Sequence, residues 1–179
     1  PPLYKKKDFN QTVSESKKAF KHLGVSDYEF LKIPATKVNE LPVATLNRKI
    51  NKFITDRCPD TVFIPFPDRH IDHRVIFDSS VVACRPLNKN SPKNVLLYET
   101  LSETHWNVPN VEPFFNPTVF INIDDTIKDK ISALKFYKSQ INTSTPSRSL
   151  KAIESLAKFR GSQNGCEYAE SFQVVRMII

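Results

Sequence analysis

The chain has 179 residues, of which 40% are hydrophobic and 25% charged, and this is typical of a globular domain that can bury a core. Its formal net charge is +7, but the basic residues are scattered without a nucleic-acid-binding motif, so we expect no nucleic-acid partner and favour a solvated basic surface or an anionic small substrate. No apolar run approaches the ~20 residues of a membrane span, and no signal peptide is visible.

Helical and strand-like patterns alternate along the chain. Apolar residues at helical spacing, bounded by Gly or Pro, predict helices at residues 14–25, 46–58, 72–85, 126–141 and 150–160. Short β-branched or aromatic runs predict strands at residues 61–66, 94–100, 117–123 and 171–179. We expect Asp124 or Asp125 to cap the fourth helix, and Ser147 or Ser149 the fifth. The alternation predicts an α/β domain with a mostly parallel sheet and helices on both faces.

The cysteines indicate the redox environment. Cys58, Cys84 and Cys166 are far apart and odd in number, and they form no CxxC motif. This pattern favours reduced thiols and a cytoplasmic protein over a disulfide framework. Cys84 is better explained as a small core residue than as a nucleophile.

The segment FPDRHIDHRVIF, at residues 66–77, is the candidate functional motif. It follows a predicted strand and leads into a predicted helix, the position where α/β proteins bind ligands. His70 and His73 are three residues apart, so both can lie on one side of a first helical turn. Asp72, between them, can fix an imidazole tautomer or raise its basicity.

A plainer interpretation competes with a site at this motif. Asp68 or Asp72 can cap the helix while both histidines lie on the surface. A catalytic zinc site needs three protein ligands and an open position for water, and only His22 and His105 remain as further imidazoles. No GxSxG, GxxxxGK[ST] or GxGxxG motif is present, which disfavours serine hydrolases and phosphate-binding loops.

Five segments extend the motif over residues ~11 to 179. In chain order they are SESKKAFKHLGV, PDTVFIPFPDRHIDHRVIFDSSVVACRP, YETLSETHW, FNPTVFINIDDTIKDKISALKFYKSQI and RGSQNGCEYAESFQVVR. Together they resemble the PIG-L/LmbE-like zinc-dependent deacetylases, which hydrolyse the acetamide of N-acetylglucosamine-containing substrates. An ordered set is more specific than one short motif. The resemblance implies a Rossmann-like three-layer sandwich that binds one Zn²⁺.

The resemblance also implies roles for individual residues. His73 matches the family's zinc ligand, His70 the histidine that stabilises the oxyanion, and Asp72 the aspartate that supports His70. Zinc would polarise the amide carbonyl and lower the pKa of the water that attacks it. The candidates for substrate binding are Arg69, Glu99 and Trp106.

One part of the family pattern is missing. The family's other two zinc ligands and its general base come from an Ala-His-Pro-Asp-Asp segment upstream of the first helix, and this sequence contains no such segment. Thr12 stands where the family tends to carry an arginine. The sequence opens on Pro-Pro rather than Met, so we expect residues 1–179 to be one truncated deacetylase domain. Its remaining ligands would lie upstream of Pro1, and the fragment alone would be inactive.

The leading hypothesis is a cytoplasmic, metal-dependent N-deacetylase. It would act on a small amino-sugar conjugate, with no nucleic-acid partner and no membrane span, and a homo-oligomer is compatible with the sequence. One alternative is an amidase of the same family that acts on a non-sugar amide. The other is a non-catalytic carbohydrate-binding protein without the metal loop.

Overall fold

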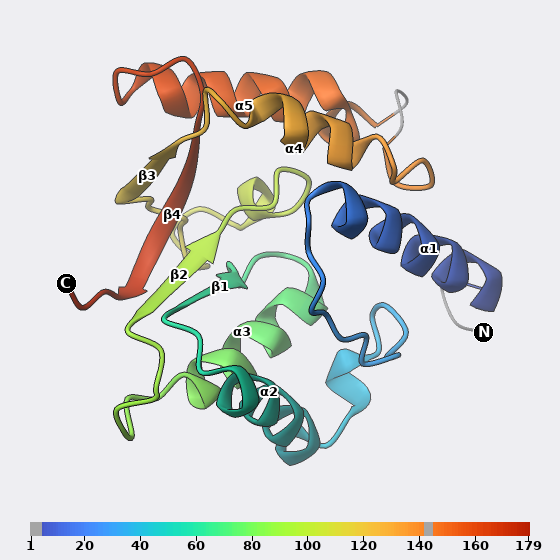
Figure 1. Ribbon diagram of the computed structural model, residues 1–179, viewed down its shortest axis with the longest axis vertical. Helices are drawn as coiled ribbons and strands as arrows, with labels where there is room; N and C mark the ends of the chain where they lie inside the picture. The colour runs from blue at the N-terminus through green and yellow to red at the C-terminus, as the bar shows by residue number, and fades with distance from the viewer. Residues whose placement is uncertain (1–4, 142–144) are drawn as a thin grey trace. The chain divides into compact units, whose positions relative to one another are not determined.

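A computed structural model of the chain describes residues 5–141 and 145–179 (Figure 1). The chain forms two compact units. The first unit comprises Pro1–Pro34 and Phe120–Glu170, and the second unit comprises Ala35–Val119 and Ser171–Ile179. Each unit is therefore built from segments that are far apart in the sequence.

Four strands form one sheet in the order β1-β2-β4-β3. Their bounds are β1 Thr61–Pro65, β2 Asn94–Tyr98, β3 Val119–Asn122 and β4 Ala169–Arg176. All four strands were predicted close to these positions. Strands β1 and β2 are parallel, with Ile64 opposite Leu97, whereas β2 and β4 are antiparallel.

The expectation of a mostly parallel sheet is wrong for these strands. Besides the antiparallel pair of β2 and β4, the N–H groups of Thr118 and Ile123, on either side of β3, donate to the carbonyls of Phe172 and Tyr168. Residue numbers thus rise along β3 while they fall along β4, as in an antiparallel pair. The connection from β3 to β4 contains two helices, α4 and α5, which pack on each other (Figure 1). Two successive helices bring the chain back antiparallel, whereas a single crossover helix gives a parallel strand. The α/β class is confirmed, while the Rossmann-like sandwich stays a prediction.

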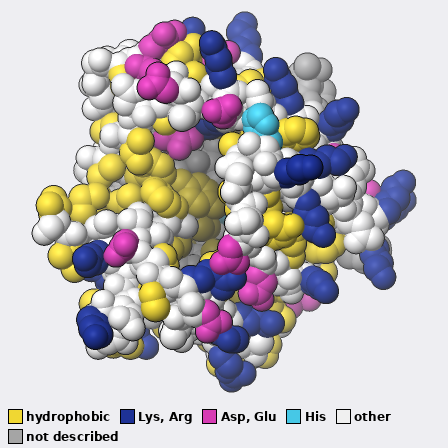
Figure 2. Space-filling view, in the orientation of Figure 1, with side chains coloured by type: hydrophobic (Ala, Val, Ile, Leu, Met, Phe, Trp, Pro, Cys, Tyr) yellow, Lys and Arg dark blue, Asp and Glu magenta, His cyan; other side chains and the backbone are white. Residues whose placement is uncertain are grey.

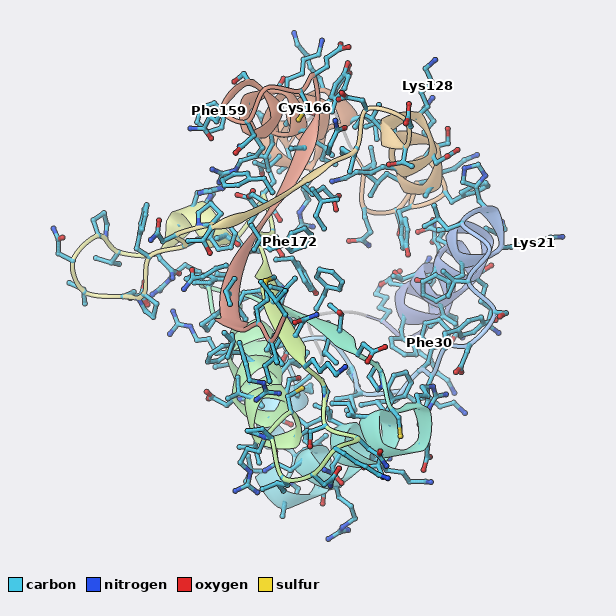
Figure 3. All side chains as sticks on the ribbon, turned by 60° about the vertical axis from the view of Figure 1, so that its left-hand side comes forward. Lys21, Phe30, Lys128, Phe159, Cys166 and Phe172 are labelled. Atoms are coloured by element: carbon cyan, nitrogen blue, oxygen red, sulfur yellow. The ribbon has the colours of Figure 1, made fainter. Side chains whose placement is uncertain are left out.

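The second unit holds the larger apolar core. Helix α2, Val43–Arg57, packs on helix α3, Ile71–Ala83, which in turn packs on β1. The buried side chains of this core are Ile54, Ile64, Phe66, Cys84, Val95, Leu97 and Phe115. Cys84 is thus the core residue that its sequence context predicted, and burial raises the pKa of its thiol. Phe63 packs against Phe172 on β4, with ring centroids 4.9 Å apart. Phe172 is labelled in Figure 3.

The described part of the first unit contains the α-helices α1 Lys6–His22, α4 Ile127–Leu134 and α5 Leu150–Ser162. Helix α1 begins earlier than predicted because the Lys5 N–H donates to the Asp8 carboxylate at 3.0 Å, which caps the first turn. Ser149 caps α5 as predicted, since its Oγ accepts from the Ala152 N–H. Helix α4, in contrast, has no side-chain cap, because Asp124 accepts instead from the backbone N–H of Tyr168 at 2.6 Å.

Two local features stabilise the first unit. The buried Glu15 carboxylate on α1 accepts from the backbone N–H and the hydroxyl of Ser139, so it ties α1 to the segment after α4. Burial raises the pKa of Glu15, but these hydrogen bonds outweigh it and the net shift is downward. After α1, Phe30, which is labelled in Figure 3, packs against the rings of Phe20 and Tyr28.

Positive charge is not gathered in one place on the face that Figure 2 draws. On the face drawn in Figure 2, Lys and Arg side chains are spread over several regions with Asp and Glu among them. Among the described residues, no helix is both long and apolar enough to cross a membrane.

Candidate functional site

The candidate site is built on the turn that joins β1 to α3 in the second unit. This turn follows the carboxyl end of β1, where the Phe66 N–H donates to the carbonyl of Tyr98 at 3.0 Å. Because β1 and β2 are parallel, the segments after both strands leave the same edge of the sheet. The sequence before α3 therefore lies beside the loop that follows β2.

Asp68 is the buried centre of the turn. Its side chain is fully enclosed, at 0% exposed, and a buried carboxylate must be compensated by donors. Oδ1 accepts from the backbone N–H of His70 at 3.0 Å and from Nδ1 of His73 at 2.8 Å. Oδ2 accepts from the hydroxyl of Thr104 at 3.0 Å. Asp68 therefore joins the turn to the loop after β2.

The two histidines lie together with their rings nearly parallel. The ring centroids of His70 and His73 are 4.8 Å apart with an interplanar angle of 25°, so the histidines do not diverge as in a simple capped helix start. Nδ1 of His73 donates to a carboxylate, which leaves the lone pair of Nε2 available. Nδ1 of His70 instead accepts from the Asp72 N–H at 3.2 Å, so its ring proton is on Nε2. One ring offers an acceptor or metal ligand, and the other offers a donor.

His70, and neither predicted aspartate, is the N-cap of α3. The carboxylate of Asp72 accepts from the backbone N–H of Thr36 at 2.6 Å and of Val38 at 3.3 Å. It thereby orders the segment around the 3-10 turn η1, Val38–Glu40, including Thr36 at a left-handed φ of 65° that a non-glycine residue rarely adopts. Asp72 contacts His70 through its backbone, and support from its carboxylate stays a prediction.

Glu112 anchors the loop after β2 to the start of α3. Its carboxylate accepts from Arg69 at 2.7 Å, from Arg74 at 2.5 Å and from the backbone N–H of Val108 at 2.8 Å. The Val108 hydrogen bond, followed by the two arginines, lowers the pKa of Glu112 to about 2. Arg74 also donates from Nε to the carbonyl of Asp68 at 2.5 Å. The loop and the histidine turn thus share one ionic network.

This network predicts a pH dependence of stability. Because the folded-state pKa of Glu112 lies below its usual value, the carboxylate stabilises the fold above about pH 4.5, and the stabilisation is lost as the pH falls toward about 2. Glu112→Gln should therefore lower the unfolding free energy in urea at neutral pH, with a difference from wild type that shrinks on acidification. Glu29→Gln, at an exposed position, is the control. If the difference in unfolding free energy between Glu112→Gln and wild type stayed constant with pH, the lowered pKa of Glu112 would be contradicted.

The three substrate-binding candidates lie on the same two segments, but they differ in exposure. The side chain of Arg69 is 48% exposed although it pairs with Glu112. Glu99 is enclosed, and it accepts from the hydroxyl of Ser171 at 2.7 Å and contacts Nε2 of His105 at 3.1 Å. Trp106 ends the 3-10 turn η2, Thr104–Trp106, and is 70% exposed. Trp106 is therefore the candidate that is most open to a ligand, and its role stays a prediction.

The remaining imidazoles do not complete a metal centre. His22 lies on α1 in the first unit, with Nε2 3.9 Å from Asp129, and His105 is paired with Glu99. No group of three or more His, Cys, Asp or Glu side chains suited to a metal ion occurs among the described residues. His73 by itself fits the role of a metal ligand, because its Nδ1 contacts the carboxylate of Asp68. Metal-ligating histidines commonly donate their other ring nitrogen to a carboxylate. Pro1, upstream of which further ligands were predicted, lies outside the described residues.

Sequence reasoning missed the importance of Asp68, Thr104 and Glu112. The sequence pattern indicated only a helix cap for Asp68, although a carboxylate between a buried strand and two histidines also indicates a functional site. Thr104 and Glu112 are 36 and 38 residues from their partners in the turn, Asp68 and Arg74. No local pattern reveals contacts at that separation.

Fold and site together define a mixed α/β protein with a His-Asp cluster after a sheet strand. The family model described as PIG-L, GlcNAc-PI de-N-acetylase, matches residues 4–84, which include this cluster. Over these residues the chain is similar to the PIG-L family, and the resemblance seen in the sequence is confirmed. The family consists of N-deacetylases and is typically metal-dependent.

Two solved structures share the fold. The conserved protein TT1542 from Thermus thermophilus superposes with a TM-score of 0.72 at 22% identity, covering 98% of this chain and 76% of that one. The N,N'-diacetylchitobiose deacetylase from Pyrococcus horikoshii, solved in complex with its inhibitor MPG, gives a TM-score of 0.73 at 20% identity, covering 97% and 68%. At these sequence identities the superpositions show a shared fold.

Proposed function

We propose that this chain forms part of a metal-dependent hydrolase that removes the acetyl group from an N-acetylglucosamine-type sugar conjugate. The main support is the pairing of His70 and His73, whose Nδ1 atoms are engaged in opposite ways. The similarity of residues 4–84 to the PIG-L family supports the reaction class, N-deacetylation. The fold shared with an N,N'-diacetylchitobiose deacetylase is compatible with an amino-sugar substrate.

In this proposal the two histidines divide the work. His73 would use Nε2 as one metal ligand, while the other ligands would come from an Ala-His-Pro-Asp-Asp segment upstream of Pro1. Residues 1–179 would then be one truncated deacetylase domain of a Rossmann-like protein. A zinc ion bound there would polarise the amide carbonyl and lower the pKa of its water.

His70 would act on the other side of the amide. Its Nε2–H would donate to the oxygen that becomes negatively charged as the carbonyl is attacked. The hydrogen bond from the Asp72 N–H to Nδ1 keeps the ring proton on Nε2. Asp68 and Asp72 would hold the two rings rather than react. Trp106 and Arg69 would line the approach of the sugar.

The decisive experiment is acetate release from N-acetylglucosamine derivatives by the full-length protein. We expect His73→Ala to lose both bound zinc and turnover, and His70→Ala to keep zinc while turnover falls by about 10²–10³-fold. His22→Ala, on α1, is the matched control and should change neither bound zinc nor turnover.

Unchanged turnover in His73→Ala would refute the role of His73 as a metal ligand. Turnover of non-sugar amides by the wild type would favour the broader amidase, and about one zinc per chain would argue against a purely carbohydrate-binding protein.

A further inference from the structure

The enclosed carboxylate of Asp68 takes no direct part in the chemistry outlined above. At 0% exposed it is removed from any substrate, so it cannot be a catalytic residue that touches the amide. All of its described partners belong to the histidine turn or to the loop after β2. A charge is costly to bury. Because these partners compensate the charge of Asp68, we infer that the carboxylate serves to order the histidine turn.

We propose that Asp68 is a positioning residue that holds the imidazole of His73 with its proton on Nδ1, so that the Nε2 lone pair faces a metal ion. A carboxylate can only accept hydrogen bonds, so the 2.8 Å contact with His73 requires a proton on Nδ1. The metal in this statement rests on the proposed function, whereas the tautomer does not.

Thr104 orients the carboxylate for this task. Its Oγ accepts from the backbone N–H of Thr100 at 2.7 Å, so the hydroxyl proton is directed to Oδ2 of Asp68 at 3.0 Å. This leaves Oδ1 to face His73 and the backbone N–H of His70. The loop after β2 thereby reaches the ring of His73 through two hydrogen bonds in series.

The neighbouring histidine shows that the effect is specific. His70 is only three residues away and stacks on His73, yet its Nδ1 accepts from the Asp72 N–H at 3.2 Å. Without Asp68, nothing among the described contacts of His73 would favour a proton on Nδ1. The two rings hold opposite tautomers because their Nδ1 atoms face opposite kinds of partner.

The tautomer of His73 can be read directly by long-range ¹H–¹⁵N NMR of the metal-free chain. In the wild type we expect Nδ1 to carry the proton. In Asp68→Ala this preference should be lost, whereas Thr104→Val should retain it, because that substitution removes a donor to Oδ2 and leaves Oδ1 in place. A proton that stays on Nδ1 in Asp68→Ala would overturn the proposal.

Asp68→Asn keeps the test decisive if the alanine variant does not fold. The amide oxygen can still accept from Nδ1, so the tautomer should persist, but the loss of charge weakens the hydrogen bond. Exchange of the Nδ1 proton with water should accelerate relative to wild type. An unchanged exchange rate would count against a role for the Asp68 charge.

Zinc affinity separates this proposal from the proposed function. In the full-length enzyme, competition with a chelator should show about 10–100-fold weaker zinc binding for Asp68→Ala, with His22→Ala unchanged. Loss of the tautomer with unchanged zinc affinity would overturn the positioning role. If His73→Ala also kept its zinc, the proposed function would fail, while Asp68 would still be shown to set the tautomer.

Discussion

Phe66→Ala is expected to lower the free energy of unfolding by about 3–5 kcal/mol. Phe66 is 1% exposed and belongs to the larger core together with Ile64 and Leu97. Its ring meets Phe115 edge-on, with centroids 5.3 Å apart and an interplanar angle of 80°, so the substitution removes apolar contact on several sides and leaves a cavity.

Urea unfolding of the second unit, followed by near-UV circular dichroism, measures this loss. The matched control is Phe114→Ala, because Phe114 is 83% exposed and truncation of an exposed side chain costs within about 0.5 kcal/mol. Phe66 immediately precedes the histidine turn, so turnover of the full-length enzyme should fall as well. Equal stability of the two variants would show that the core does not extend to the turn.

Asp72→Ala is expected to lower the free energy of unfolding by about 2–4 kcal/mol, for two reasons. The substitution leaves the backbone N–H groups of Thr36 and Val38 without their acceptor, and a buried donor without a partner costs about 1–3 kcal/mol. It also removes a negative charge from the first turn of α3, where the helix dipole favours one.

Two further variants isolate the cause. Asp72→Asn retains an acceptor oxygen and should recover a substantial part of the stability, whereas Asp78→Ala, at an exposed position on the same helix, should change little. The measurement is chemical denaturation together with hydrogen exchange at the amides of Thr36 and Val38. If Asp72→Ala slowed turnover without faster exchange at these amides, its carboxylate would act on His70 rather than on the segment around η1.

The secondary structure was largely predictable because it depends on local patterns. The apolar run at 61–66 became β1, and the helical spacing after it became α3. Boundaries were less predictable where a cap decides them. Helix α1 starts at Lys6 because of Asp8, and α4 ends at Leu134 although the apolar stripe continues to Ile141.

Strand direction was the main element of the fold that local patterns did not reveal. A helix between two strands predicts a parallel pair, as β1 and β2 show around α3. The stretch between β3 and β4 reads as two helices, but their packing on each other decides how the chain returns. That packing depends on side chains such as Ile127 and Ala157, which belong to one buried cluster.

The sequence by itself determined the place of the candidate site and its two histidines. The order of residues puts His70 and His73 after a buried strand, and their spacing puts them on one side of a helical turn, since both follow from local geometry. Only the tertiary structure decided what each ring can do. The partners of His73 and Asp72 depend on Asp68 in a buried turn and on Thr36 and Val38 of a distant segment. Contacts between distant segments exist only when the chain is folded, because burial and strand pairing bring them together.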